Sequence, residues 1–411
     1  MTLKNTVNNR AGLFAGRAVT AVVLCALLLS SFAPAGARGA SKASVKTKAT
    51  LMFTGDLMCL KGQQYDASAK KGFDFYPAYR YVAQIFKEAD MVCGNLESLI
   101  SESNPLTKDQ VYENNEPQCN GPLAYLDALR KASFDVLVTA NNHTCDWGAV
   151  GINETKKHLD EYGFLNVGTH FEKSKSTGKK GSEAGPGTED RFVIYNAKGI
   201  RVAILAYTHL INQRQKMTPE QMDTMVHLYD PEVVKKDIAD AKAAGAQFVV
   251  VYLHNGTENT EELTKTQIDD SGFVAEAGAD LIIGSHPHCL QKCAYINTSD
   301  GREVLCMYSM GNFVSSMARD INNDTLILKV TLTSTQTKDK TDVRMTGASY
   351  IPCRVAPKAG HSFVVIPILK YKDGSYASNS LKEAAQRISK IIDGVIPERN
   401  KTTENPQNKS K

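Results

Sequence analysis

From residue 49 onward, short apolar runs alternate with longer stretches in which apolar residues recur at helical spacing. Short runs rich in Val, Ile and Leu predict buried strands, whereas a period of about 3.6 residues predicts amphipathic helices. Strands are expected at residues 50–54, 90–93, 135–139, 192–195, 202–207, 248–253, 281–283 and 304–307. Helices are expected at residues 77–88, 122–132, 151–162, 231–244 and 265–277. Strands and helices therefore alternate, which indicates an α/β fold.

The pattern changes after Phe313 to longer alternating strands, at residues 325–333 and 342–350. Such strands expose one face and bury the other, so they predict a second sheet completed by antiparallel pairing. An amphipathic helix is expected at 381–392, and a polar, disordered tail at 400–411. The main domain is thus expected at 49–370, followed by a C-terminal helix and tail at 371–411.

The N-terminal segment has the composition of an export signal. Basic residues precede an apolar run at 18–29, and small residues follow at 32–37. This predicts a signal peptide or membrane anchor at 1–37 and a linker at 38–48. The apolar run is short for a membrane span of about 20 residues, and the sequence leaves cleavage and retention as an anchor both open.

A second polar stretch, at 172–190, is rich in Lys, Ser, Gly and Glu and has no apolar period. It predicts a surface insertion loop. The formal charge of the whole chain is +4, without a concentrated basic stripe, so no nucleic-acid partner is expected.

Nine cysteines are present, and all but Cys25 follow the expected export signal. An even number of cysteines in an exported chain permits up to four disulfides, whose pairing the sequence leaves open. No CxxC pair occurs, which argues against a structural zinc site made of cysteines.

Polar segments with metal-ligand side chains follow six of the expected strands, where α/β proteins usually place their active sites. They are Thr54-Gly55-Asp56, Gly94-Asn95-Leu96-Glu97, Asn141-Asn142-His143 with Asp146, His254-Asn255-Gly256-Thr257-Glu258, Gly284-Ser285-His286-Pro287-His288, and Tyr308-Ser309-Met310-Gly311-Asn312-Phe313.

These segments supply carboxylate, amide and imidazole groups, which suit divalent cations. Each segment by itself is also compatible with an ordinary turn, and Pro287 suits a rigid turn between two histidines. Six such segments in series favour a metal site over six unrelated turns. The candidate metal ligands are Asp56, Glu97, Asn142, His254, His286 and His288.

The order of these segments resembles the calcineurin-like metallophosphoesterases. The strings GADLIIGSHPHCLQ and YSMGNF at residues 278–313 are similar to the CapA-type branch, the poly-gamma-glutamate capsule biosynthesis proteins. The resemblance covers about residues 49–316. It implies a four-layer α/β/β/α sandwich and a site for one or two divalent ions, with Mn, Zn and Fe not distinguished.

The resemblance also implies individual roles. His143 would be the general acid, oriented by Asp146, and Glu258 would support His254 or form a surface salt bridge. Tyr308, Asn312 and Phe313 would line the pocket or, by the favoured interpretation, pack beneath it.

Two features depart from the wider superfamily. Met58 stands where a D-x-H motif would place histidine, and Asn95 and Glu97 replace the first aspartate and shift the carboxylate of G-D-x-x-D. Both changes are typical of the CapA branch, so they support the closer resemblance and weaken the expectation of phosphatase activity.

The expected function is an exported factor for making, exporting or anchoring poly-gamma-glutamate at the outer face of the cell membrane. Its expected partners are membrane polymer-synthesis proteins and an anionic glutamyl polymer or phosphoester substrate. Two alternatives stay open: a metal-dependent hydrolase of a phosphoester or gamma-glutamyl amide bond, and a non-catalytic scaffold of a membrane synthesis complex.

Overall fold

The computed structural model describes residues 45–112, 117–172, 191–337, 340–371, 373–392 and 394–399. The expected export segment at 1–37, the insertion loop beyond its first residue, Glu172, and the tail at 400–411 lie outside the described residues. None of the described helices combines the length and the apolar character that crossing a membrane requires.

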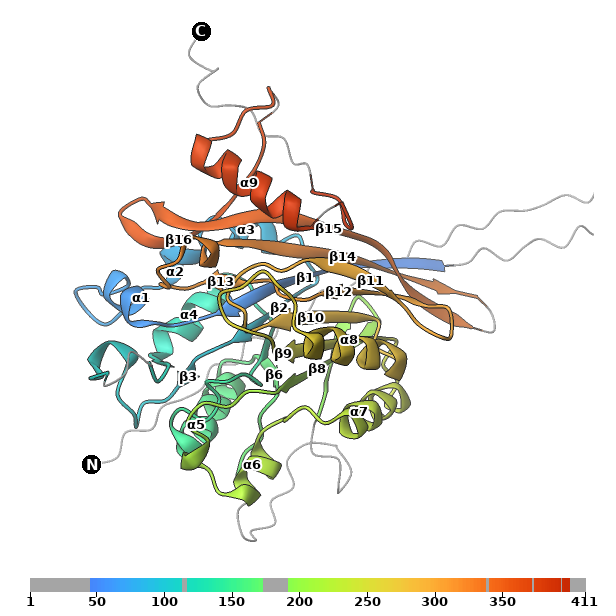
Figure 1. The fold of residues 1–411 in the computed structure, drawn as a ribbon, viewed down its shortest axis with the longest axis horizontal. Helices are drawn as coiled ribbons and strands as arrows, with labels where there is room; N and C mark the ends of the chain where they lie inside the picture. Colours follow the sequence, from blue (N-terminus) through green and yellow to red (C-terminus); the bar gives the residue numbers. More distant parts are fainter. Residues whose placement is uncertain are drawn as a thin grey trace, which may run out of the picture. The chain divides into compact units, whose positions relative to one another are not determined.

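The larger of two main sheets follows the order β16-β15-β14-β1-β2-β5-β6, with β13 also paired to β1 (Figure 1). Strands β1, β2, β5, β6 and β13 pair in parallel, whereas β14, β15 and β16 add antiparallel strands at one side. Their bounds are β1 (Val45–Leu57), β2 (Met91–Leu96), β5 (Val136–Val138), β6 (Leu165–Val167), β13 (Asn312–Val314), β14 (Asp324–Gln336), β15 (Thr341–Lys358) and β16 (His361–Pro367).

The second main sheet follows the order β11-β12-β10-β9-β8-β7. Its central strands are parallel, and antiparallel strands close both edges. The bounds are β7 (Val193–Ala197), β8 (Ile200–Thr208), β9 (Phe248–His254), β10 (Leu281–Ser285), β11 (Cys293–Asn297) and β12 (Glu303–Met307). A small separate sheet pairs β3 (Leu99–Ile100) with β4 (Asn120–Gly121).

An apolar core lies between the two main sheets. Leu51 and Phe53 of β1 belong to one buried cluster with Ile204 of β8 and Val250 of β9. Alternate residues of a strand point to opposite faces, so Met52 turns away from this core toward the helices on the other side.

Helices cover the outer face of each sheet, which makes four layers. The first group packs on the larger sheet and consists of α1 (Lys61–Asp66), α2 (Tyr76–Tyr79), α3 (Ala83–Phe86) and α4 (Leu123–Lys131). The second group packs on the other sheet and consists of α7 (Pro231–Ala243) and α8 (Lys265–Ala277). The expected α/β class and the α/β/β/α layering are confirmed.

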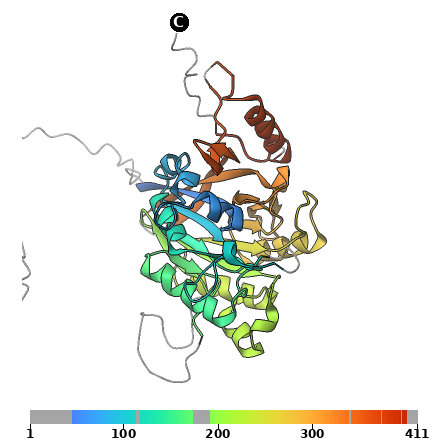
Figure 2. The same ribbon diagram turned by 90° about the vertical axis from the view of Figure 1, so that its left-hand side faces the viewer.

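The remaining helices are α5 (Gly148–Glu161), α6 (Pro219–Met225) and α9 (Asn379–Ile392). Ala384 and Ile388 of α9 join the cluster between the sheets, so this helix is part of the folded domain. In both views α9, in red, lies at the opposite end of the described domain from α5 and α6, in green (Figure 1 and Figure 2).

Every strand expected from apolar runs is present, with shifted ends. The single helix expected at 77–88 is wrong, because α2 and α3 are separate short helices. Tyr79 of α2 and Phe86 of α3 both pack their rings on Phe134, at centroid distances of 6.2 and 5.1 Å. These tertiary contacts hold both short helices in place.

Strand β1 is longer than expected. It begins at Val45 and pairs with β14, so residues 45–48 form a strand instead of the end of a linker. The sequence pattern also did not reveal α1, α6, β3, β4, β6, β11, β13 or β16, most of which are short.

The eight cysteines beyond the expected export signal are free thiols, and all are buried. No disulfide therefore links any of them in the described part of the chain. Burial raises the pKa of thiols such as Cys306 to about 12, so these cysteines act as small apolar side chains.

Candidate metal centre

The six predicted ligands meet at the carboxyl ends of central strands from both sheets. All six are buried. The strands place them as follows: Asp56 in β1, Glu97 directly after β2, Asn142 in the turn after β5, His254 at the end of β9, and His286 and His288 after β10.

Two glycines beside these ligands allow neighbouring backbone segments to approach each other closely. A Cβ atom at Gly55 would lie 1.9 Å from the carbonyl oxygen of Gly311, and one at Gly284 would lie 1.9 Å from that of Tyr308. Any other residue would clash there. The pairing of β1 with β2 also shifts register just before Asp56, which is how a bulge redirects a side chain.

Asn95 connects the two buried carboxylates. Its side-chain amide donates to Asp56 Oδ1 at 2.8 Å and lies 3.3 Å from Glu97 Oε2. The Asn95 carbonyl oxygen accepts from the side-chain amide of Asn141 at 3.1 Å. Asn95, the residue that departs from the superfamily pattern, therefore acts here as a hydrogen-bond donor that holds both acidic ligands.

His288 faces both carboxylates. Its Nε2 lies 3.6 Å from Glu97 Oε1, and its Nδ1 lies 3.6 Å from Asp56 Oδ2. The same Nδ1 is 2.9 Å from Asn312 Oδ1, a hydrogen bond that orients the ring.

His254 approaches Glu97 from the second sheet. Its Nε2 lies 3.9 Å from Glu97 Oε1 and 3.0 Å from Asn142 Oδ1. Its Nδ1 is 2.8 Å from Ser285 Oγ, which orients the ring. The rings of His254 and His286 meet edge to face at a centroid distance of 4.9 Å.

The backbone at the histidine pair is strained. His286 has a φ of 97° and His288 a φ of 57°, in the left-handed region that side chains with a Cβ atom rarely adopt. Such strain persists only where the surroundings enforce it, and it concentrates at functional sites. Here it directs both imidazoles toward the carboxylates, which an ordinary turn would not need.

The electrostatics of the cluster favour a cation. Burial raises the pKa of Glu97 well above its usual range, and the charge of Asp56 raises it further. Burial, followed by the neighbouring histidines, lowers the pKa of His254 well below its usual value and that of His286 to about 3. Neutral imidazoles beside buried carboxyl groups form a typical ligand set for a divalent ion.

Two buried polar atoms support this interpretation. Glu97 Oε1 and His286 Nδ1 have no hydrogen-bond partner among the described residues. Buried polar groups are rarely left without a partner. The ligand atoms of Glu97, His254 and His286 lie within 4.8 Å of one another, as do those of Asp56, Glu97 and His288. The residues therefore fit one or two divalent ions, with Glu97 common to both groups.

His143 and Asp146 form a buried pair next to this cluster. His143 Nδ1 lies 2.7 Å from Asp146 Oδ2, and the same oxygen accepts from the backbone N–H of Cys119 at 2.6 Å. Burial lowers the pKa of His143, but Cys119 and Asp146 outweigh burial and raise that pKa well above its usual value.

A cavity of about 450 Å³ opens beside the centre. His143 and His288 contribute to its wall, so the general-acid candidate and one ligand both face the same space. The other lining residues are Met58, Leu60, Pro117, Asn212, Gln213, Glu258 and Met317.

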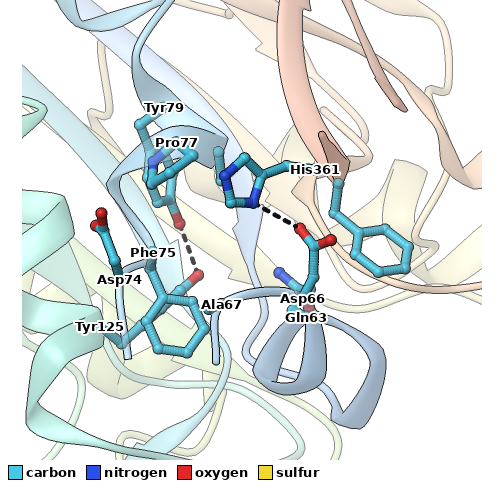
Figure 3. A pocket seen from close by; sticks show the side chains of 11 residues that line it. Gln63, Asp66, Ala67, Asp74, Phe75, Pro77, Tyr79, Tyr125 and His361 are labelled. Carbon is cyan, nitrogen blue, oxygen red and sulfur yellow. Dashed lines mark hydrogen bonds and ion pairs between the residues drawn. The ribbon is translucent and has the colours of Figure 1, made fainter. Parts of the chain in front are cut away.

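Met58 forms part of this wall. Its carbonyl oxygen accepts from Gln63 Nε2 at 2.7 Å and from the Tyr125 hydroxyl at 2.9 Å. The Tyr79 hydroxyl donates in turn to that of Tyr125 at 2.8 Å, within a small pocket between α1, α2 and β16 (Figure 3). The backbone of Met58 is thus held in place, and its side chain supplies apolar surface where the superfamily has an imidazole.

Glu258 does not occupy the expected position. The sequence predicts that Glu258 supports His254 or forms a surface salt bridge, but Ser285 is the residue that supports His254. A carboxylate oxygen of Glu258 instead lies within 4.8 Å of ring nitrogens of His286 and His288. Asn312 orients His288, whereas Phe313 packs against Phe86 in the core at 5.8 Å.

Three contributors to the site were missed as such in the sequence: Asn95, Ser285 and Cys119. Asn95 and Ser285 lie inside the polar segments that follow the strands, but neither residue type by itself indicates which group it holds. Cys119 is far from any motif, and only the fold brings it to His143.

Comparison with known proteins shows where this chain has relatives. The model of a family described as bacterial capsule synthesis protein PGA_cap matches residues 50–317. The capsule biosynthesis protein CapA of Bacillus anthracis is 28% identical over 272 residues, which cover 65% of this chain and 60% of the relative. The PGA biosynthesis protein CapA of Bacillus subtilis (strain 168) is 29% identical over 268 residues, which cover 64% and 62%. The match spans about three fifths of the length of these relatives.

Solved structures with similar folds include a calcineurin-like phosphoesterase, YfkN, from Bacillus subtilis. It is 14% identical, with a TM-score of 0.44, and the match covers 85% of this chain and 99% of that one. A 5'-nucleotidase precursor from Thermus thermophilus is also 14% identical, with a TM-score of 0.43 and coverage of 84% and 59%.

Proposed function

The chain belongs to the PGA_cap family of bacterial capsule synthesis proteins, and we therefore propose that it is an exported, metal-dependent factor in poly-gamma-glutamate capsule assembly. The matched residues, 50–317, include every candidate metal ligand. The polymer is proposed because a relative of this chain is named a PGA biosynthesis protein.

The observation that carries the metal-dependent part is the buried ligand cluster. Glu97 Oε1 has no hydrogen-bond partner among the described residues and faces imidazole nitrogens of His254 and His288. Asp56, Glu97, His254, His286 and His288, with Asn142, would hold the ion or ions. A bound divalent cation supplies Lewis-acid polarisation of a phosphoryl or carbonyl oxygen.

Proton donation and the shaping of the cavity fall to other residues of the chain. Asp146 binds Nδ1 of His143, which leaves Nε2 as the atom that can give a proton to a leaving group. Because His143 faces the cavity, a substrate bound there can present its leaving group to this ring. Met58, Leu60 and Met317 provide apolar wall that excludes water from the reacting bond.

The cavity wall favours a phosphoester over a gamma-glutamyl amide as the substrate. Among the described residues that line the cavity there is no Lys or Arg, and Glu258 is acidic. A glutamyl polymer carries a carboxylate on every unit, and no lysine or arginine among these lining residues would pair with that row of charges. A phosphoester would carry its negative charge at the metal centre instead.

The proposal is tested by metal content and turnover of the full chain. Elemental mass spectrometry compares the native protein with a His286→Ala, His288→Ala double variant. A His361→Ala variant is the matched control, because His361 lies near Asp66, outside the centre. Each protein is assayed on bis(p-nitrophenyl) phosphate and on a gamma-glutamyl oligomer.

We expect divalent metal in the native and His361→Ala proteins, its loss in the double variant, and phosphodiester turnover that follows the metal. Turnover of the glutamyl oligomer alone would identify an amide hydrolase. If the folded native protein shows neither metal nor turnover, the non-catalytic scaffold is the remaining role. Met58, which stands where the superfamily has a histidine, favours that role.

Export and assembly with membrane polymer-synthesis proteins are also part of the proposal. The apolar run at 18–29 supports export. Deletion of residues 1–37 should keep the protein inside the cell, and fractionation of cells that express each form measures this. Recovery of the deleted form outside the cell would contradict the proposed signal.

A further inference from the structure

We propose that Cys119 is a positioning residue: together with Asp146 it fixes the imidazole of His143 for proton donation at the metal centre. This inference rests on the proposed function, because it assigns a supporting group to the proton donor of that site.

The three side chains form one buried group. The Cys119 sulfur, a ring nitrogen of His143 and a carboxylate oxygen of Asp146 lie within 4.8 Å of one another. Asp146 Oδ2 accepts from the Cys119 backbone N–H at 2.6 Å and faces His143 Nδ1 at 2.7 Å. Cys119 therefore holds the carboxylate through its backbone N–H and places its thiol beside the imidazole.

The fold holds Cys119 rigidly at this point. Its carbonyl oxygen accepts from the Leu99 N–H at 3.0 Å, at the start of the small β3–β4 sheet. The next residue, Asn120, accepts from the Ser101 N–H at 2.8 Å. Leu99 follows Glu97 by two positions, so Cys119 ties the segment that carries a metal ligand to the proton donor.

The composition Cys–His–Asp also occurs in cysteine nucleophile triads, but the surroundings of Cys119 do not suit a nucleophile. The thiol is 0% exposed and packs in an apolar cluster with Met58 and Leu60. Burial raises the pKa of Cys119, whereas reactive cysteines are accessible and have lowered pKa values.

A separate metal ion in this group is also disfavoured by geometry. His143 Nδ1 and Asp146 Oδ2 are 2.7 Å apart, which is a hydrogen-bond distance. Two ligands of one tetrahedral zinc ion would be about 3.3 Å apart, given bond lengths near 2.0 Å. Because neither a nucleophile nor a metal site fits this geometry, a positioning role is the one that suits all three side chains.

Kinetics on two phosphodiesters, one with a good and one with a poor leaving group, test this role in the metal-loaded full chain. Proton donation matters mainly for the poor leaving group. We expect Cys119→Ala to lower turnover of the poor substrate roughly tenfold and of the good one less than about twofold. A structural defect would lower both equally, which would overturn the proposal.

The double variant Cys119→Ala, His143→Asn separates action through His143 from an independent effect. It should be no slower than His143→Asn alone, because the two residues act as one unit. Additive losses would contradict the proposal. Cys353→Ala is the matched control, since it removes another fully buried free thiol far along the chain, in β15.

A spectroscopic measurement keeps the inference testable even if the chain hydrolyses neither ester. Imidazole nitrogen spectra of the full chain, with His143 assigned from the His143→Asn variant, report the tautomer and the exchange of the Nδ1 proton. Cys119→Ala should speed that exchange, with partial rescue in Cys119→Ser and no change in Cys353→Ala. An unaltered His143 signal in Cys119→Ala would refute the positioning role independently of catalysis.

Discussion

The side-chain amide of Asn95 donates to Asp56 Oδ1 at 2.8 Å, from β2 to the adjacent strand β1. The same amide nitrogen lies 3.3 Å from Glu97 Oε2. One neutral donor thus connects both acidic ligands of the candidate metal centre and reduces their repulsion before any cation binds.

Replacement of Asn95 by aspartate should make folding depend on metal. The Asn95→Asp variant loses the donor and adds a third buried carboxylate, so the metal-free protein should lose about 1–3 kcal/mol of stability. Added divalent metal should restore more stability to the variant than to the native chain. Thermal unfolding with a chelator and with metal measures both, and equal gains would contradict the role assigned to Asn95.

Replacement of Glu97 by glutamine should separate stability from metal binding. Glu97→Gln removes a buried carboxyl group whose ionised form is disfavoured by burial and by Asp56, so the metal-free protein should be as stable as the native chain or more stable. Its affinity for metal should fall at least about tenfold, because a shared ligand is lost. Calorimetric unfolding and metal titration give the two quantities, and unchanged affinity would exclude Glu97 as a ligand.

Substitution of Gly55 should lower the free energy of unfolding of the protein. A Cβ atom there would lie 1.9 Å from the Gly311 carbonyl oxygen, so Gly55→Ala should cost about 3 kcal/mol or more. Gly272→Ala is the control, because Gly272 is in α8 and a Cβ atom there meets no atom within 4 Å. The control should gain about 0.5–1 kcal/mol in a denaturant titration. Similar effects of both substitutions would argue against the close approach.

Acid should destabilise the fold through His227. Burial, and then Arg191 and His170, lower the pKa of His227 well below its usual value. The unfolded chain takes up a proton below a pH of about 6.5 and the folded chain does not, so stability is present above that pH and is lost as the pH falls. The loss from this residue is at most about 1.4 kcal/mol per pH unit.

His227→Gln should make the dependence of unfolding free energy on pH less steep between pH 7.5 and 5.5. The variant is expected to be less stable than the native chain at pH 7.5, so the slopes are compared and not the absolute values. Parallel curves would show that His227 takes up its proton equally in both states.

Two features of the chain follow from the pattern of its amino acids. Strands such as β9 and β10 are rich in Val, Ile and Leu and buried along their whole length, as expected for strands covered on both faces. The predicted ligands lie at or just beyond the carboxyl ends of the expected strands, so their meeting at one edge followed from the alternation of strands and helices. That they bind metal stays a prediction.

The fold class and the residue types available for chemistry could be predicted from the amino-acid sequence, because burial and metal binding each demand particular side chains. The hydrogen bonds that orient those side chains could not, since they depend on tertiary contacts. Asn95 holds Asp56, Ser285 holds His254, and Cys119 lies beside His143 only because segments distant in sequence are brought together. The break between α2 and α3 has the same cause, since ring contacts with Phe134 outweigh local helix propensity.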